Sequence, residues 1–393
     1  MADMNNTYSK KMIFRASCAG ILMFGIAVLV LGSIAPDLKV KLDLDEVSAG
    51  TLFSILPVGM LAGSLLFGPV ADKYGYRILL SVSCFLLFAG FEGLALSRDS
   101  GLIKLFIFLT GLGGGAINGA TSALVSDISD TDKAANLSLL GGFFALGALG
   151  IPLVLGILRD TFSFETIISG VGILALITGI VFLVINYPPP KQEHGFPLKG
   201  LKAMLNDRLL LLIAFFLFFQ SSFEGIINNW TTSWLTDHLM VRTGSALFAL
   251  SSFVAGMTLM RFLTGSVLRS ASAKNIMTIS FLLLFSGLTL MRLSGSLSMA
   301  VPGLVLLGAG LAGGFPVMLG ITGERFRELS GTAFSFVMSV ALMGNMIVNY
   351  LMGLIAGRFG ISNLTTVAFI ELIMQIILFI FIIRILNKTK VNN

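Results

Sequence analysis

The chain has 393 residues, of which 55% are hydrophobic and only 12% are charged, with a formal net charge of +6. Its mean hydropathy of +0.94 excludes an ordinary water-soluble protein, because the exposed surface would carry more apolar area than water tolerates. The basic residues cluster beside the apolar segments, so the positive charge indicates membrane topology and no nucleic-acid partner.

The apolar runs are continuous and lack the alternation of barrel strands, so a lipid bilayer should be crossed by helices whose backbone amides are satisfied within each segment. About 20 apolar residues cross the hydrocarbon core. On that measure the chain is an all-α membrane protein with twelve transmembrane helices. Their expected limits are 12–35, 48–71, 77–97, 102–128, 133–158, 163–187, 209–236, 244–268, 275–294, 298–322, 330–356 and 363–386.

The distribution of Lys and Arg predicts the orientation of these spans. With the amino terminus inside, most of the 26 basic residues fall on the cytoplasmic side, as the positive-inside rule requires. We therefore expect both termini in the cytoplasm of a multi-pass protein of the cell membrane, a bacterial inner membrane. The first apolar run is too long for a cleavable signal, and none is expected.

The polar stretch from Pro188 to Lys202 divides the chain into two halves. One offset of 197 residues (256 minus 59) aligns similar residues of the two halves: Gly59 with Gly256, Gly68 with Gly265, Gly111 with Gly308, Asp127 with Glu324, Gly147 with Gly344, and Gly156 with Gly353. A constant offset through four span pairs indicates duplication. The expected organisation is a six-helix bundle over 1–187, a cytoplasmic linker over 188–208 and a second six-helix bundle over 209–393.

A charged, glycine-rich turn joins the second and third spans, between Gly68 and Arg77. Its order of glycine, a small triplet, Asp72, a basic residue, Gly75 and Arg77 resembles the signature of the major facilitator superfamily. The resemblance covers nearly the whole chain. It implies two pseudo-symmetric six-helix bundles that work by alternating access around a solute site near the bilayer midplane. It also implies that Asp72 and Arg77 contribute to gating.

In that family spans one, four, seven and ten line the cavity, so their polar residues should describe the cargo. The candidate solute-binding residues are Asn118 in span four, Gln220, Glu224, Asn228, Asn229 and Trp230 in span seven, and Asn345 in span eleven. Amides bind hydroxyl groups and an indole packs on a sugar ring, so a small neutral solute such as a sugar is favoured. The run around Glu224 and Trp230 loosely resembles the bacterial fucose and proton symporters.

Ionisable residues within a span are costly and default to functional hypotheses. Glu224 is the candidate proton-coupling carboxylate; the alternative is a structural carboxylate bonded to Gln220, Ser221 or Asn228. Arg261 lies in span eight at a depth that differs from that of Glu224 by roughly 15 Å or more, so no direct ion pair is expected. Arg261 is a candidate gating residue, as are Asp127 and Glu324 at matching ends of spans four and ten.

Other functions remain less favoured. A proton-driven exporter of hydrophobic compounds is the main alternative, and sodium stays open as the coupling ion. A receptor would need a soluble signalling domain. An enzyme is not expected, because neither histidine shares a site with a buried nucleophile, and we expect no cofactor and no metal. The expected partners are a small-molecule solute, the coupling ion and the bilayer, and the expected oligomeric state is a monomer.

Overall fold

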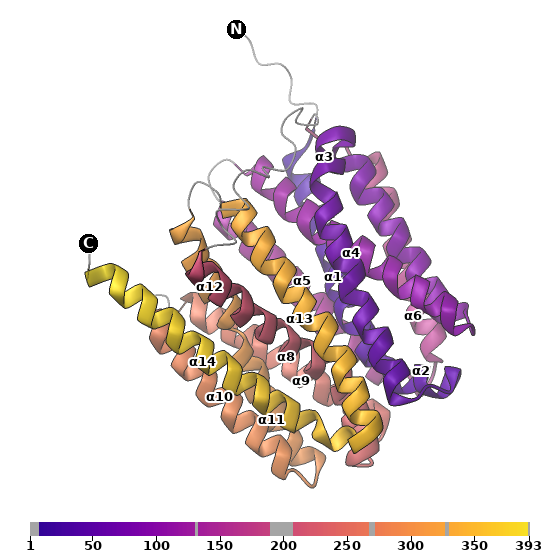
Figure 1. Cartoon of the computed structure of the whole chain (residues 1–393). Coiled ribbons are helices and arrows are strands. Elements are labelled where there is room, and N and C mark those ends of the chain that lie inside the picture. Colours follow the sequence, from indigo (N-terminus) through magenta and orange to yellow (C-terminus); the bar gives the residue numbers. More distant parts are fainter. Residues whose placement is uncertain (1–7, 130–132, 189–206, 267–271, 327–329, 392–393) are drawn as a thin grey trace. The chain divides into compact units, whose positions relative to one another are not determined.

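The computed structural model describes residues 8–129, 133–188, 207–266, 272–326 and 330–391, which are almost entirely helical (Figure 1). The helices of the first half are α1 (Lys10–Ser33), α2 (Ala35–Leu42), α3 (Glu46–Leu96), α4 (Ser100–Ile128), α5 (Lys133–Leu158) and α6 (Phe164–Val184). Those of the second half are α8 (Arg208–His238), α9 (Thr243–Ser266), α10 (Ala273–Leu293), α11 (Leu297–Leu311), α12 (Gly314–Arg325), α13 (Ser330–Phe359), the short 3-10 helix η2 (Ile361–Asn363) and α14 (Leu364–Val391).

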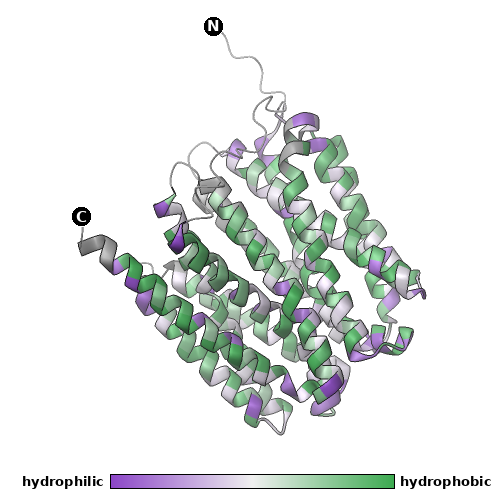
Figure 2. Cartoon of the chain, in the orientation of Figure 1, coloured by the Kyte–Doolittle hydropathy of each residue, from purple (hydrophilic) through white to green (hydrophobic). Residues whose placement is uncertain are grey.

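Twelve segments of the described chain are long and apolar enough to cross a membrane, which confirms the predicted all-α membrane fold. Hydrophobic residues cover most of the length of these helices, and hydrophilic residues gather toward helix ends (Figure 2). α3 holds two of the spans, Glu46–Phe67 and Lys73–Leu96. They meet at Gly75, whose φ of 79° lies in the left-handed region that favours glycine.

The chain divides into two compact units. Unit 1 contains residues 1–43 and 55–195, and unit 2 contains residues 44–54 and 196–393. Unit 2 therefore includes the first turns of α3, which the sequence analysis assigned to the first bundle. Within unit 1, α1 packs on α4 and α5; within unit 2, α8 packs on α13 and α14, and α11 packs on α9 and α10.

Glycines bring helices into backbone contact at matching places in the two units. In unit 1 a Cβ on Gly59 would collide with the carbonyl oxygen of Phe108. In unit 2 a Cβ on Gly256 would collide with that of Val305. Both the glycines and their contacts are 197 residues apart, so the offset found in the sequence corresponds to a repeated packing contact. Small residues allow this close approach between membrane helices.

A second glycine pair repeats the same relation. A Cβ on Gly111 would collide with the carbonyl oxygen of Leu56 within unit 1, and a Cβ on Gly308 would collide with that of Phe253 within unit 2. These partners, too, are 197 residues apart. The two units thus use one packing scheme between their second and fourth spans, which is the pseudo-symmetry predicted from the sequence.

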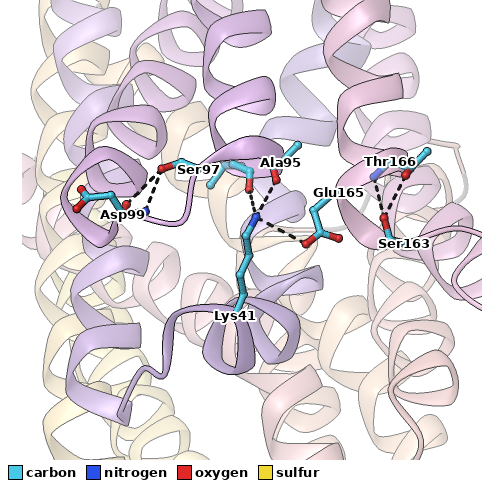
Figure 3. A network of polar contacts seen from close by, with 8 residues as sticks. Lys41, Ala95, Ser97, Asp99, Ser163, Glu165 and Thr166 are labelled. Carbon is cyan, nitrogen blue, oxygen red and sulfur yellow. Dashed lines mark hydrogen bonds and ion pairs between the residues drawn. The ribbon is translucent and has the colours of Figure 1, made fainter.

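The helix α2, which the sequence analysis did not predict, is fastened to one end of unit 1 by its charged side chains. Lys41 Nζ donates to the carbonyl oxygens of Ala95 at 2.7 Å and Leu94 at 3.4 Å, and lies 3.7 Å from Glu165 Oε1 (Figure 3). These carbonyls belong to the last turn of α3, where backbone acceptors lack helical donors and a cation is favoured. Lys41 therefore joins α2 to the ends of α3 and α6.

A second ion pair holds α2 to the end of α5. Arg159 Nη2 lies 3.0 Å from Asp37 Oδ1, and the two side chains are 24% and 19% exposed. Burial raises the pKa of Asp37, and the positive charge of Arg159 offsets part of this rise. The carboxylate is thus tolerated at neutral pH largely because Arg159 is beside it.

The glycine contact between α1 and α5 predicts a position-specific loss of stability. A Cβ on Gly147 would collide with the carbonyl oxygen of Leu22, whereas a Cβ on Gly150 meets nothing within 4 Å. We expect Gly147→Ala to destabilise the protein by about 1–3 kcal/mol and Gly150→Ala to cause no loss. The midpoint of thermal unfolding in lipid nanodiscs measures both variants. Equal midpoints for the two variants would show that the contact does not limit packing.

The Asp37–Arg159 pair predicts a pH-dependent defect. Removing the guanidinium in Arg159→Gln leaves a half-buried carboxylate without its cation, which we expect to cost about 1–2 kcal/mol at pH 7. A carboxyl whose folded pKa is raised contributes stability below its unfolded pKa and loses it as pH rises through the folded pKa. The difference in unfolding free energy between Arg159→Gln and the wild type should therefore become smaller as pH falls from 7 toward about 5.

The double variant Asp37→Asn/Arg159→Gln provides the matched control for this prediction. Because it has no carboxylate to bury, its unfolding midpoint should lie above that of Arg159→Gln at pH 7 and should not recover on acidification. If the unfolding midpoints of Arg159→Gln and the wild type differ by the same amount from pH 7 to about 5, Arg159 does not stabilise the Asp37 carboxylate.

Candidate functional site

Helix α8 carries the longest buried polar run in the described chain. Its start is capped by Asp207, whose Oδ1 accepts from the backbone N–H of Leu210 at 2.9 Å. An apolar first half follows, and then a polar stretch in which ten of the side chains are buried: Gln220, Ser221, Ser222, Asn228, Asn229, Trp230, Thr231, Thr232, Ser233 and Trp234. A helix this polar is stable in lipid only when other helices cover it.

Asn349 of α13 is the centre of a hydrogen-bond cluster that holds α8. Its Oδ1 accepts from Asn229 Nδ2 at 3.1 Å and from Trp230 Nε1 at 3.2 Å. Its Nδ2 donates to the backbone oxygen and to Oδ1 of Asn345 at 2.8 and 2.9 Å. Asn349 is fully buried, so these bonds form in a low-dielectric interior, where an unpaired amide would be costly.

Asn345 ties the same two helices together one turn earlier on α13. Its Nδ2 donates to the backbone oxygen of Ser221 at 3.0 Å. Gly225 leaves the room for this contact, because a Cβ there would collide with the Asn345 amide. Asn229, Trp230 and Asn345, three of the predicted solute-binding residues, therefore belong to one cluster, organised by Asn349.

Trp230 is completely buried, and Phe53 packs edge-on against its ring with centroids 5.0 Å apart and an interplanar angle of 80°. Phe53 belongs to the part of α3 that lies in unit 2. With its N–H donated to Asn349 and an aromatic edge on its ring, Trp230 is an anchor of the helix packing in this structure.

Several polar atoms of α8 are buried without a hydrogen-bond partner. They are Asn228 Oδ1, Asn229 Oδ1, Thr231 Oγ1, Thr232 Oγ1, Ser233 Oγ and Trp234 Nε1. All of them are uncharged, and together they comprise amide acceptors, hydroxyls and one indole donor. Such orphan groups are rare in folded proteins and call for a specific explanation.

Gln220 reaches a break in the tenth span, where α11 ends at Leu311 and α12 begins at Gly314. Its Nε2 donates to the backbone oxygen of Leu311 at 2.9 Å. Pro316 has no N–H, so the carbonyl of Ala312 lacks its helical donor and the helix is interrupted. The predicted solute-binding amide thus caps a broken helix, a contact that the sequence analysis did not foresee.

Glu224 is partly buried on α8, and Arg261 is partly buried on α9. No ion pair joins them among the described residues, yet the positive charge of Arg261 acts on the Glu224 carboxylate. The depth estimate had placed the two groups too far apart for a direct pair. Glu224 and Arg261 both belong to unit 2.

Two of the predicted gating residues, Asp127 and Arg77, make polar contacts within unit 1. Asp127 Oδ2 accepts from Tyr76 OH at 3.0 Å, while Arg77 Nη2 donates to Asn186 Oδ1 at 2.8 Å and to the backbone oxygen of Ile185 at 3.1 Å. The side chain of Asp72 lies outside the described residues, and Glu324 is exposed at the end of α12.

Asn118 is partly buried on α4 of unit 1, and its backbone oxygen accepts from Thr121 Oγ1 at 3.4 Å. A polar contact absent from the sequence analysis joins α8 to α14, where Ser222 Oγ donates to Glu371 Oε1. In the described part of the chain no group of three or more His, Cys, Asp or Glu side chains is placed to hold a metal ion.

Comparison with known proteins agrees with this architecture. The sequence profile of the Major Facilitator Superfamily matches residues 17–239. The glucose/mannose transporter GlcP of Bacillus subtilis is 24% identical over 345 residues, which cover 84% of each chain. The 3-(3-hydroxy-phenyl)propionate transporter of Escherichia coli is 26% identical over 365 residues, which cover 86% of each chain.

A solved structure of a D-xylose–proton symporter shares the fold, with a TM-score of 0.79 over 95% of this chain and 97% of that chain at 15% identity. The profile match covers more than half of the chain, and the full-length relatives are transporters and not enzymes. From its twelve spans, its repeated glycine contacts and these matches, the protein belongs to the Major Facilitator Superfamily of membrane transporters.

Proposed function

We propose that the protein is a secondary active transporter that works by alternating access and takes up a small neutral hydroxylated solute, such as a sugar, together with a proton. The observation that carries this proposal is the set of uncharged, unpartnered polar atoms on α8. Sugar hydroxyls both donate and accept hydrogen bonds, so they match a mixture of amide oxygens, hydroxyls and an indole N–H.

The distribution of charge supports a neutral cargo. Arg261 is the cation near Glu224, and the position that corresponds to it at the 197-residue offset is Ser64. Ser64 Oγ donates to the backbone oxygen of Gly115 at 3.5 Å within unit 1, so that position supplies no second positive charge. Two positively charged side chains would bind a carboxylated solute more strongly than Arg261 alone. The relative GlcP, a glucose/mannose transporter, also supports a neutral sugar.

Glu224 is the coupling carboxylate in this proposal. It lies on the same helix as the unpartnered atoms, and the charge of Arg261 acts on it. Proton uptake would neutralise Glu224 and remove the cost of desolvating it when the site closes. The relation to the fucose and proton symporters stays a prediction, as does the choice of a proton over sodium.

The remaining assignments follow from the same scheme. Asp72, Arg77, Asp127, Arg261 and Glu324 are proposed as gating residues, and Asn118 is proposed to contribute to the solute site from α4. The bias of basic residues favours both termini in the cytoplasm and a bacterial inner membrane. A monomer suffices, because one chain supplies both six-helix bundles.

Transport into proteoliposomes tests this function. Under an imposed inward proton gradient, the wild-type protein should accumulate at least one labelled sugar from a panel that also holds carboxylated arenes. The Glu224→Gln variant should lose gradient-driven accumulation by about tenfold or more, because a proton-transfer group is removed. Its counterflow exchange of the same sugar should persist, because exchange needs no net proton movement.

Glu92→Gln is the matched control, since Glu92 is a membrane-depth carboxylate of unit 1 held by Ser169. It should accumulate sugar like the wild type. Accumulation of the carboxylated arenes alone would contradict a neutral cargo. Gradient-driven extrusion of a hydrophobic dye would contradict uptake and indicate an exporter. Full gradient-driven accumulation by Glu224→Gln would make Glu224 a structural residue.

A further inference from the structure

A second carboxyl within a membrane span lies where α14 packs on α8. Glu371 of α14 is 3% exposed and lies about 15 Å along the last span, Ile361–Asn387, from its start. Ser222 Oγ of α8 donates to its Oε1. The carboxyl therefore occupies the interface between α14 and the helix that carries the candidate solute site.

Two buried oxygens at this interface have no partner. Glu371 Oε2 accepts no hydrogen bond, and neither does Oε1 of Gln375. Gln375 is fully buried, and its Nε2 donates to the backbone oxygen of Phe219 on α8 at 3.4 Å. Residues four apart on a helix lie on the same face, so the two unpartnered acceptors face the same side of α14.

No charged side chain of the described structure forms an ion pair with Glu371. From α10, Arg292 Nη1 donates to Thr365 at 3.3 Å and to Thr366 at 3.4 Å. On α8, Glu224 follows Ser222 by two residues and so points away from the side that Ser222 presents. Arg358 lies at the end of α13, and Arg384 follows Glu371 on α14 by 13 residues, roughly 20 Å along the helix.

A single proton would resolve this arrangement. A buried carboxylate without a cation is strongly disfavoured, and such a group is neutralised instead. Protonated at Oε2, Glu371 would become a donor, and Gln375 Oε1 would be the acceptor within reach on the same helix face. Oε1 would still accept from Ser222. One proton thus satisfies both orphan oxygens and removes the uncompensated charge.

Glu92 of unit 1 provides a contrast within the same chain. It is only partly buried, and its two oxygens accept from Ser169 Oγ at 2.8 and 2.9 Å. The two oxygens of Glu92 therefore share the one hydroxyl hydrogen of Ser169. In the pair of Ser222 and Glu371, by contrast, Oε2 of the carboxyl has no donor.

We propose that Glu371 is a proton-binding site, in which the proton sits on Oε2 and is shared with Gln375 Oε1, and that Ser222 transmits its occupancy to α8. This site is additional to Glu224. Its proton binding does not depend on the identity of the solute, whereas its part in transport rests on the function proposed above.

Infrared spectroscopy of the purified protein in lipid tests proton binding without any solute. At pH 7 the wild type should show the C=O stretch of a protonated carboxylic acid, and Glu371→Gln should remove one such band. Glu92→Gln should retain it. Gln375→Leu should move the band to higher wavenumber, because the carboxylic acid loses its hydrogen-bond acceptor, and Ser222→Ala should move it as well.

An unchanged band in Glu371→Gln would overturn the proposal. A wild-type band that appears only when choline replaces sodium would also overturn it and would identify a sodium site. Should Glu371→Gln fail to fold, Gln375→Leu and Ser222→Ala decide the matter: a shift in both supports proton binding, and no shift in either refutes it.

The role in transport has its own readout. In proteoliposomes Glu371→Gln should flatten the dependence of gradient-driven accumulation on external pH, while Glu92→Gln should keep the wild-type profile. A wild-type profile in Glu371→Gln, with the infrared band lost, would overturn the transmission to α8. Failure of every solute to be transported by the wild type would refute the proposed function and leave the infrared result standing.

Discussion

The structure depends on one constraint, which is that a polar side chain within a lipid-embedded bundle must find its partners inside the protein. Helix α8 tests this constraint most severely, because ten of its polar or indole side chains are buried. Asn349 meets part of this demand by accepting from Asn229 and Trp230 and donating to Asn345. The atoms left over on α8 are uncharged, and this is why a neutral solute is the function that fits best.

Close helix contact provides the frame in which such a cluster can form. Gly59 and Gly256 meet the backbone carbonyls of Phe108 and Val305, and both contacts recur at the same 197-residue offset. Backbones that approach this closely leave little tolerance for a misplaced side chain. The repeated glycine contacts therefore set the positions of the helices in both units. Residues that differ at matching positions, such as Arg261 and Ser64, give the two units different charges.

Much of the fold could be predicted from the sequence because membrane spans are local features of hydropathy and length. The twelve spans, the turn at Gly75 and the repeat of glycines needed no knowledge of contacts. The helix α2 was missed because its Lys41 is held by groups far away in the sequence, Ala95 and Glu165. The interruption between Leu311 and Gly314 was also missed: it follows from Pro316, and the amide that caps it, Gln220, comes from another helix. The Asn349 cluster and the contact between Ser222 and Glu371 join residues more than a hundred positions apart, and periodicity carries no information about such pairs.

The central claim is that the unpartnered atoms of α8 receive the solute. A structure of the protein in lipid with its transported sugar bound tests this most directly. The account predicts solute density within hydrogen-bond distance of Asn228 Oδ1, Asn229 Oδ1 or Trp234 Nε1. Solute density that contacts no residue of α8, with these atoms still unpartnered, would contradict it.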